Sequence, residues 1–364
     1  MNHHTHPEAG PDLSRVNRDT PGTVRDIYVR AVGTALPGPA LSNEVLARRF
    51  GMTGHWEQWV QAFIGTQSRH LAIDLETGQP YCSLADLCRM AASRALDTAG
   101  LTAADVDLMI LGTATPDMLM PATVNVVADQ LGINDVATYQ LQSGCTGAVQ
   151  ALNAAYQMML TCAYRTALVL GGETATKYYD LSLDFARLPP TQMINYVLFG
   201  DGAGAMVLTP GPGPAAAVIR KVVTRLEGMN RPPGQTLDWF GPADRDSDRP
   251  PAIEDYKAIE ESVPIMASEL LAELLDNLGW KDSEVGCVLP PQLSGQMTKR
   301  IMAGLKLPDA REISCVRETG NIGNAMPFFQ LERVLPEMRP GDRAICLSVE
   351  SSKWIKGGFA LQKV

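Results

Sequence analysis

Histidine is scarce in this 364-residue chain and is missing from most of its length. All five histidines lie in the first fifth of the sequence, at His3, His4, His6, His55 and His70. A site built from later residues therefore has no imidazole, unless the N-terminal tail or a partner supplies one. Histidine, cysteine and aspartate also form no cluster with metal-ligand spacing, so the sequence predicts no metal site.

Other absences exclude several classes of protein. No apolar run reaches the roughly 18 residues that suggest a membrane-spanning helix. The net charge of −9 lacks the basic footprint of nucleic-acid-binding proteins, although an acidic carrier protein could still bind a local basic patch. The seven cysteines show no paired framework and no Cys-x-x-Cys spacing, which indicates reduced thiols and a cytoplasmic protein. The Gly-rich stretch 200–204 precedes a strand rather than a helix, so it predicts no nucleotide-binding loop.

The composition and the breaks along the chain predict its domain organisation. Hydrophobic residues make up 45% of the chain and charged residues 20%, which is typical of a soluble globular protein. Residues 1–25 lack a signal-peptide core and are interpreted as a flexible tail. A Pro/Gly run after residue 209 indicates a linker between an N-terminal half, 26–209, and a C-terminal half, 217–364. Within the first half, the polar-aromatic stretch 174–195 reads as loops that could form a lid.

The segment 142–148, Gln-Ser-Gly-Cys-Thr-Gly-Ala, holds the strongest candidate for a catalytic residue. A β-type run leads into it, and the helical spacing of 148–160 follows. Cys145 therefore lies where a strand turns into a helix, among small residues that allow a substrate to approach. The positive end of the helix dipole favours the thiolate there. A free cysteine in the core is the alternative.

An internal repeat indicates that the two halves are copies of one α/β unit. Three segments recur in the same order at offsets of 179, 176 and 177 residues, aligning Asp97 with Asp276, Cys145 with Asn321, and Glu173 with Glu350. A common offset in three places is improbable for chance matches between short apolar strings. We therefore expect Cys145 and Asn321 to lie in symmetry-related turns, each before a central helix, with the active site between the halves.

With these turns in view, the chain resembles the thiolase superfamily, in its ketoacyl-acyl-carrier-protein synthase III branch. The resemblance implies an α/β fold of five layers, αβαβα, built from two pseudo-twofold-related halves. It also implies a homodimer and acyl transfer through a Cys thioester. The acyl donor would be a carrier-protein or coenzyme A thioester, with no bound cofactor. The matching segments are 59–69, 113–117, the Cys145 turn, 199–204 and 320–321.

The same resemblance suggests substrate-binding residues. Trp59 belongs to the Trp-rich entry segment of the family. Met118, Leu119 and Met120 would reach across the dimer and shape the acyl pocket of the partner. Ordinary packing at a dimer interface is an equally good explanation of those three apolar side chains.

The chain departs from the family at the catalytic histidine. Pro291 stands where that histidine would be, and Ser294 stands where the Asn of the same turn would be, so both are candidate substrate-binding positions. In the family, His and Asn stabilise the enolate that forms during decarboxylative condensation. Loss of one such donor costs on the order of a hundredfold in rate. Acylation of Cys145 is less affected.

A second departure lies near the C-terminus, where the family often has a Gly-rich loop and this chain has Ser348–Trp354. Glu350 in this loop is the repeat mate of Glu173. One interpretation is a structural hydrogen-bond anchor; the other is a catalytic general base for an incoming hydroxyl or amine. Glu318 is a weaker candidate base, and Asp201 is expected to form a turn.

Three hypotheses for the function follow. The leading one is an acyltransferase of specialised metabolism, in which Cys145 passes an acyl group from a carrier-protein or coenzyme A thioester to an O, N or S acceptor positioned by Asn321. The second is a carbon–carbon bond-forming synthase in which Ser294, Gln292 or a carboxylate replaces His. The third is a non-catalytic partner subunit of a related synthase.

Overall fold

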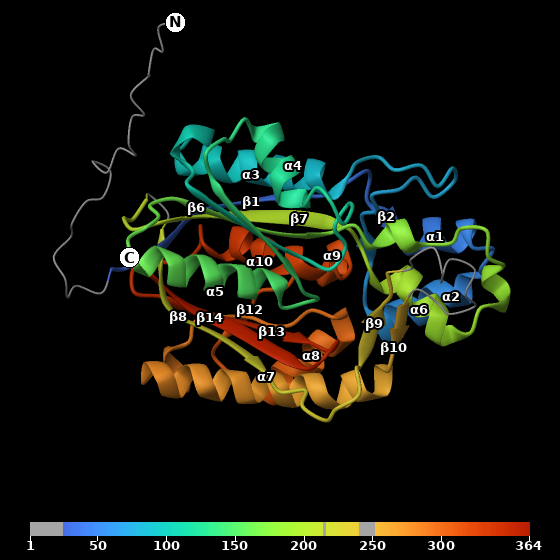
Figure 1. Cartoon of the computed structure of the whole chain (residues 1–364). Helices are drawn as coiled ribbons and strands as arrows, with labels where there is room; N and C mark the ends of the chain where they lie inside the picture. Colours follow the sequence, from blue (N-terminus) through green and yellow to red (C-terminus); the bar gives the residue numbers. More distant parts are fainter. Residues whose placement is uncertain (1–24, 214–215, 240–251) are drawn as a thin grey trace, which may run out of the picture.

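The computed structural model describes residues 25–213, 216–239 and 252–364 (Figure 1). Its main sheet has ten strands in the order β12-β11-β13-β14-β8-β1-β7-β6-β4-β5. Only two residue pairs, Tyr28–Val218 and Val29–Ala217, join β1 to β8, so the sheet consists of two five-stranded sections. Of the predicted tail, 1–25, residues 1–24 lie outside the described ranges.

The two sections have the same topology. In the first, β4 pairs in parallel with β5 and β6, and β7 pairs antiparallel with β6 and β1. In the second, β11 pairs in parallel with β12 and β13, and β14 pairs antiparallel with β13 and β8. The strands of the first section are β1 (Tyr28–Ala35), β4 (Leu108–Thr113), β5 (Ala137–Gln142), β6 (Ala167–Glu173) and β7 (Gly202–Thr209). Those of the second are β8 (Ala217–Leu226), β11 (Cys287–Leu289), β12 (Arg311–Glu312), β13 (Arg343–Glu350) and β14 (Ile355–Lys363).

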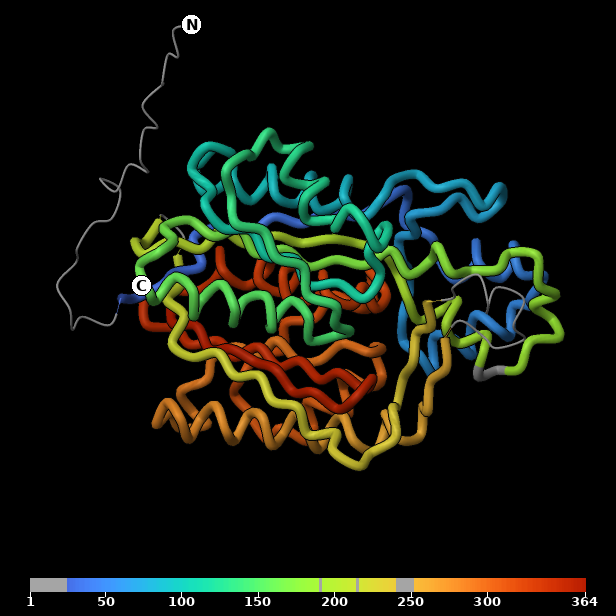
Figure 2. The backbone as a smooth tube through the Cα atoms, in the orientation of Figure 1, coloured from blue at the N-terminus to red at the C-terminus, as the bar shows by residue number. Residues whose placement is uncertain are grey.

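Helices form three layers around these sections. Figures 1 and 2 show α5 (Gly147–Leu160) and α10 (Met326–Val334) between the two sections. The outer face of the first section is covered by α3 (Leu84–Ala99) and α4 (Thr123–Leu131), and that of the second by α7 (Tyr256–Leu278) and α8 (Gly295–Leu305). The predicted five-layer αβαβα thiolase fold, with two pseudo-twofold-related halves, is therefore confirmed.

Local signals explain why the equivalent helices end alike. Gly100 ends α3 and Gly279 ends α7, both in the left-handed conformation, at φ 65° and φ 64°. Glycine adopts this conformation with little strain. Both helices also begin at an acceptor side chain, since Ser83 caps α3 and Asp255 caps α7. The repeat that aligns Asp97 with Asp276 is thus a repeat of helix ends.

Glycines in the strands bring the middle helices close to the first sheet section. A Cβ on Gly204 would lie 2.2 Å from Cβ of Phe328, and one on Gly171 would lie 2.5 Å from the carbonyl oxygen of Asn324. No larger residue fits at these two positions without moving the start of α10. This close packing fixes the helix starts that carry the site.

A smaller cluster of helices lies beside the ends of the strands. It contains α1 (Asn43–Arg49), α2 (Gly54–Trp59), a π-helical turn (Val60–Ile64) and α6 (Pro190–Leu198), packed around buried Phe50, Phe185 and Val197. Stretch 174–195 was expected to be loops, but its last six residues belong to α6, because Pro190 occupies the first helical position, where proline is favoured. The remaining elements are β2 (Leu41–Ser42), β3 (Ser68–Arg69), β9 (Gln235–Leu237), β10 (Ala252–Glu254) and α9 (Val316–Thr319).

Candidate active site

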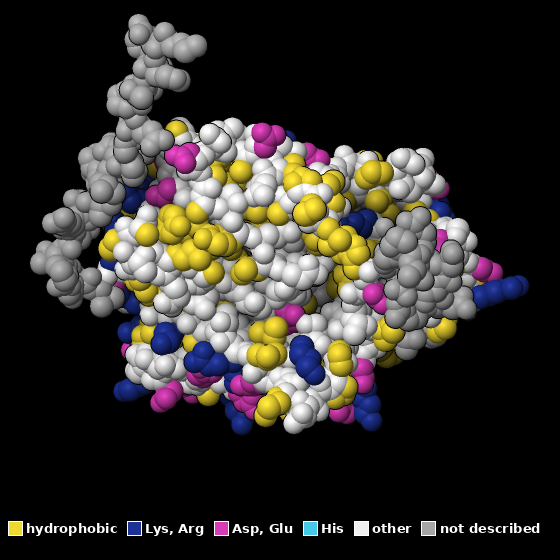
Figure 3. Space-filling model, in the orientation of Figure 1, with side chains coloured by type: hydrophobic (Ala, Val, Ile, Leu, Met, Phe, Trp, Pro, Cys, Tyr) yellow, Lys and Arg dark blue, Asp and Glu magenta, His cyan; other side chains and the backbone are white. Residues whose placement is uncertain are grey.

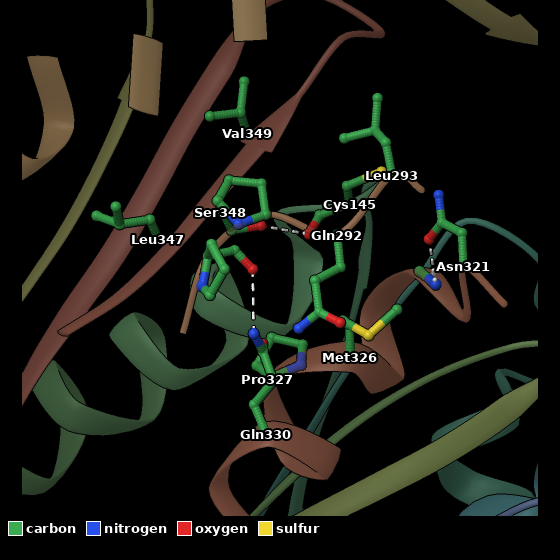
Figure 4. Close-up of a pocket in the computed structure, with 13 residues that line it drawn as sticks. Cys145, Gln292, Leu293, Asn321, Met326, Pro327, Gln330, Leu347, Ser348 and Val349 are labelled. Carbon is green, nitrogen blue, oxygen red and sulfur yellow. Dashed lines mark hydrogen bonds between the residues drawn. The ribbon is translucent and has the colours of Figure 1, made fainter. Parts of the chain in front are cut away.

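Cys145 and Asn321 line one cavity between the two halves (Figure 4). Cys145 comes directly before Thr146, the cap of α5, and Asn321 lies in the turn that leads into α10. This is the arrangement that the internal repeat predicts. The cavity has a volume of about 30 Å³, which is room for a water molecule rather than for an acyl chain.

The surroundings of the Cys145 thiol keep it protonated. The side chain retains some accessible surface in the cavity but is enclosed by protein atoms on the other sides. Burial, followed by the negative charges of Glu350 and Glu173, raises the pKa of Cys145 to about 12. Its own backbone N–H acts in the opposite direction but does not offset these effects. The predicted thiolate is therefore wrong for this state of the site.

The start of α5 explains why the helix dipole does not ionise the thiol. Its first N–H groups already have acceptors: the N–H of Thr146 donates to Oε2 of Glu350 at 3.3 Å, and that of Ala148 donates to Oδ1 of Asn324 at 2.9 Å. The N–H of Gly147 donates to the carbonyl of Gly144 at 2.9 Å. A carboxylate at the helix start thus takes the place that a thiolate would otherwise occupy.

Asn321 presents its amide group to the cavity. Its Oδ1 accepts a hydrogen bond from the N–H of Gly323 at 3.0 Å, which fixes the orientation of the side chain (Figure 4). Its backbone is held by Leu198 and Gly200, each through one hydrogen bond. Within the described part of the chain, Nδ2 of Asn321 donates no hydrogen bond. This N–H₂ group is free to bind a carbonyl or enolate oxygen.

The residues proposed to replace histidine have structural partners. Pro291 lines the cavity but carries no proton-transfer group. Oε1 of Gln292 accepts hydrogen bonds from the N–H groups of Cys315 and Val316, at 2.7 and 2.8 Å, and so holds the start of α9. Ser294 caps α8 by accepting from the N–H of Met297 at 3.1 Å, and it does not line the cavity.

No carboxylate, amine or imidazole stands among the described residues that line this cavity. Their polar groups are amides, thiol and hydroxyl, together with backbone atoms. Glu350 does not line it either; this side chain packs against the other side of the turn, where a Cβ on Gly144 would lie 3.2 Å from its Oε1. Glu318 is exposed and pairs with Arg333 at 3.4 Å. Asp201 was predicted to form a turn, but its buried carboxylate accepts from Ala72 and Thr176, which lie 129 and 25 residues away, so it joins distant segments instead.

Sequence reasoning missed Asn324, Gln330 and the role of Ser348. Nδ2 of Asn324 donates to the carbonyl of Ser143 at 3.0 Å and to Glu173 at 2.6 Å. Ser348 donates to the carbonyl of Cys145 at 2.7 Å, and Gln330 donates to that of Pro290 at 3.0 Å (Figure 4). The repeat could have revealed Asn324, because it lies 176 residues after Ala148, the same offset as between Cys145 and Asn321.

The other predicted substrate-binding residues lie away from the cavity. Trp59 is partly buried, with its ring centroid 6.0 Å from that of Phe63. Its segment contacts the first turn of α8, where Gln296 donates to the carbonyl of Ala62 at 2.8 Å. Leu119 and Met120 are 67% and 84% exposed, so within one chain they contribute nothing to the site.

The molecular surface shows how apolar and charged side chains are distributed. Figure 3 shows hydrophobic side chains gathered over α4 and α5, whereas charged side chains concentrate over α7. No helix of the described ranges is long and apolar enough to cross a membrane. The same residues hold no group of three or more side chains that could bind a metal ion.

Comparison with protein families gives a match to 3-oxoacyl-[acyl-carrier-protein (ACP)] synthase III over residues 139–226, which include Cys145. The β-ketoacyl-[acyl-carrier-protein] synthase III of Rhodospirillum centenum is 31% identical over 303 residues, which cover 83% of this chain and 88% of the relative. A β-ketoacyl-[acyl-carrier-protein] synthase III of Streptomyces coelicolor is 29% identical, with 88% and 92% covered.

Solved structures of similar fold also include a member of the 3-oxoacyl-(acyl carrier protein) synthase III family. AbyA1, a tetronic acid condensing enzyme, superposes with a TM-score of 0.90 at 57% identity, covering 92% of this chain and 99% of that one. The 3-oxoacyl-(acyl carrier protein) synthase III of Pseudomonas aeruginosa PAO1 superposes with a TM-score of 0.80 at 26% identity, covering 93% and 98%.

Proposed function

Because the chain belongs to the 3-oxoacyl-[acyl-carrier-protein] synthase III family, we propose that it is a condensing enzyme that forms a tetronic acid ring. The solved structure with 57% identity is a tetronic acid condensing enzyme, and this supports the proposal. Among the sequence hypotheses, carbon–carbon bond formation fits the comparisons as well as acyl transfer to oxygen does. A tetronic acid needs both reactions.

The ring defines the two substrates. A tetronic acid is a five-membered lactone whose C3–C4 bond joins an activated methylene carbon to a former acyl carbon. Its O1–C2 bond is an ester. Disconnecting these two bonds gives a β-ketoacyl thioester and a 2-hydroxyacyl thioester. Condensation replaces one thioester bond by a carbon–carbon bond, and lactonisation replaces the other by an ester, so each closed ring releases two thiols.

The absence of an imidazole among the described residues that line the cavity is the observation that carries this proposal. A malonyl donor must lose carbon dioxide while its enolate is stabilised, for which the family uses His with Asn. The methylene of a β-ketoacyl thioester lies between two carbonyl groups, so its proton is acidic enough to be lost to solvent and the enolate forms without decarboxylation; the departing Cys145 thiolate takes up a proton once the carbon–carbon bond has formed. A site with Asn321 and no imidazole suits the second kind of nucleophile.

The residues then take the following roles. The Cys145 sulfur attacks the 2-hydroxyacyl thioester, releases the donor thiol and holds the acyl group as a thioester. The free N–H₂ of Asn321 donates to the enolate oxygen of the β-ketoacyl thioester. Ser348, which holds the carbonyl of Cys145, positions the turn. Carrier-protein and coenzyme A thioesters are both chemically suitable donors.

The exposed apolar loop formed by Met118, Leu119 and Met120 suggests a homodimer. The base of the loop is fixed: Lys177 donates to the carbonyls of Thr115 and Pro116, and Asp117 accepts from the N-terminus of α3. Leu119 and Met120 are therefore held out into solvent on a fixed base, and β5 is one of the two edge strands of the main sheet. A second copy of this chain would bury both features. We also infer a cytoplasmic location, because all seven cysteines are unpaired.

Intact-protein mass spectrometry tests the proposal. The wild type and Cys145→Ala are each incubated with 2-hydroxyacyl, β-ketoacyl and malonyl thioesters, singly and in pairs. We expect a 2-hydroxyacyl adduct on the wild type alone, and a tetronic acid with two equivalents of thiol when the β-ketoacyl thioester is added. Carbon dioxide from the malonyl donor would favour a decarboxylating synthase instead. No adduct from any donor would leave the partner-subunit hypothesis.

A further inference from the structure

Glu350 is a buried carboxylate that the proposed reaction does not use. It ends β13 in the second half of the chain, yet three of its four hydrogen-bond donors belong to the Cys145 turn in the first half. Ser143 Oγ donates to Oε2 at 2.8 Å, Thr146 Oγ1 at 2.6 Å and the N–H of Thr146 at 3.3 Å. Ser352 donates to Oε1.

A neighbouring amide sets the direction of these hydrogen bonds. Nε2 of Gln150 donates to Ser143 Oγ and to Thr146 Oγ1, both at 2.8 Å. Each hydroxyl accepts from Gln150 and therefore directs its own proton to Glu350. The carboxylate is thus surrounded by donors alone, the environment that an ionised carboxylate requires.

The close approach depends on glycine. A Cβ on Gly144 would lie 3.1 to 3.3 Å from the Cγ, Cδ and Oε1 atoms of Glu350, so the carboxylate lies directly against the backbone that precedes Cys145. Ser348, two residues earlier on β13, holds the carbonyl of Cys145. One strand of the second half therefore holds the turn both before and after the thiol.

We propose that Glu350 is a positioning residue that clamps the Cys145 turn from the second half, and that its buried charge restrains the thiol from ionising. The charged groups that act on the thiol are Glu350 on β13 and Glu173 on β6, and both raise its pKa. Glu350 acts more strongly than Glu173, and burial acts more strongly than either. A resting thiol of this kind reacts slowly with oxidants and stray electrophiles.

The inference rests on the proposed function only in taking Cys145 as the acylated residue. The first measurement of its test does not use a substrate. Alkylation of Cys145 by iodoacetamide is followed by peptide mass spectrometry from pH 7 to pH 10, with Cys145→Ala to identify the modified peptide. A failure of acyl loading would refute the proposed function and leave this measurement interpretable.

Glu350→Gln is the informative variant because it keeps the shape and removes the charge. Its amide oxygen can accept from Ser143 and Thr146, and its N–H₂ can donate to the hydroxyl of Ser352. We expect alkylation at pH 8 to become roughly threefold to tenfold faster, because the thiolate fraction rises when a neighbouring negative charge is removed. Turnover with substrates should fall, mainly in kcat, because the weaker clamp leaves the turn less well positioned.

Two further variants make the result decisive. Glu318→Gln removes a matched charge from the exposed pair with Arg333 and should leave the alkylation rate unchanged. Glu350→Ala removes both charge and clamp and should lower kcat further than Glu350→Gln does. An unchanged or slower alkylation of a folded Glu350→Gln, checked by its circular dichroism and melting temperature, would overturn the proposal.

Discussion

The ends of β4 and β11 differ although the two strands occupy equivalent places in the two halves. Ile110 of β4 pairs with Val169, and Leu289 of β11 pairs with Cys346 at the equivalent position. Beyond this point β4 continues through Leu111, Gly112 and Thr113, whereas the second half has Pro290, Pro291 and Gln292. Proline has no N–H for the strand ladder, so β11 stops.

This difference explains why the cavity opens at the end of β11 and not at the end of β4. At the end of β4, Thr113 Oγ1 and the N–H of Ala114 donate to Glu173, which closes that end with hydrogen bonds. At the end of β11, Gln292 turns away to hold α9, and the two prolines line the cavity beside Cys145. The cavity therefore opens where a strand ends early. Three of the four donors to Glu350, the repeat mate of Glu173, come from the other half.

The largest expected effect comes from removing the Cys145 thiol, which has an amide, Asn321, as its repeat equivalent in the second half. Cys145→Ala should abolish the acyl adduct and lower the rate of ring formation by at least about 10³-fold, since the covalent step is lost. Steady-state kinetics with the thioester pair measures this loss. Cys162→Ala, which removes the exposed cysteine, is the control and should retain the adduct. A Cys145→Ala protein that still turns over would show that Cys145 is not the acylated residue.

Substitution of Asn321, the repeat equivalent of Cys145 in the second half, should separate acylation of Cys145 from the condensation step. Asn321→Ala removes the N–H₂ donor, so we expect ring formation to fall by roughly 10²- to 10³-fold while acylation of Cys145 persists. The adduct measured by mass spectrometry and the product measured by absorbance report the two steps separately. Asn321→Ala should not shift the pH dependence of Cys145 alkylation. Equal loss of loading and condensation would contradict a role confined to the enolate.

A substitution at the end of β11 should make this chain more like its family. Pro291→His places an imidazole beside Cys145, and we expect Cys145 alkylation at pH 8 to become about tenfold faster, because the imidazole can accept the thiol proton. Slow release of carbon dioxide from a malonyl thioester should accompany it. Pro291→Gln, with a side chain of similar size and no basic nitrogen, is the control. Equal rates for both variants would mean that position 291 does not direct its side chain to the thiol.

Much of the fold was predictable because its signals are local or repeated. The Ser83 cap and Gly100 mark both ends of α3 within one short stretch, and the repeat offset predicted the symmetry-related turns of Cys145 and Asn321. The helix within 174–195 was missed because the polar-aromatic character of the stretch suggested loops; Pro190, which favours a first helical turn, was the local signal for a helix.

The electrostatics of the site was not predictable from sequence, since it depends on contacts between distant residues. Glu350 and Ser143 are 207 residues apart, and Glu173 and Asn324 are 151 apart. The turn sequence predicted a helix dipole that would ionise Cys145. It could not show that Glu350, Asn324 and the carbonyl of Gly144 already accept from the N-terminal N–H groups of that helix. The roles of Gln292 and Ser294 as caps likewise required the positions of α9 and α8.

The smallest expected effect concerns the carboxylate that closes the end of β4. Burial raises the pKa of Glu173 to about 7 from a reference value of 4.5, although its hydrogen-bond donors act in the opposite direction. Between these values the folded chain binds more protons than the unfolded chain, so the free energy of unfolding falls as pH rises from 4.5 to 7. The slope from one group is at most about 1.4 kcal/mol per pH unit.

Glu173→Gln removes this titration, so the stability curve should be flatter between pH 5 and pH 7, whatever the overall change in stability. Urea unfolding at several pH values measures the slope. Burial also raises the pKa of Asp201, to about 6, so Asp201→Asn should flatten the curve further, mainly below pH 6, and serves as the matched variant. If Glu173→Gln leaves the slope unchanged, the donors at the end of β4 hold Glu173 ionised throughout. The end of β4 would then be closed by a charged side chain, whereas no charged side chain of the described residues lines the cavity at the end of β11.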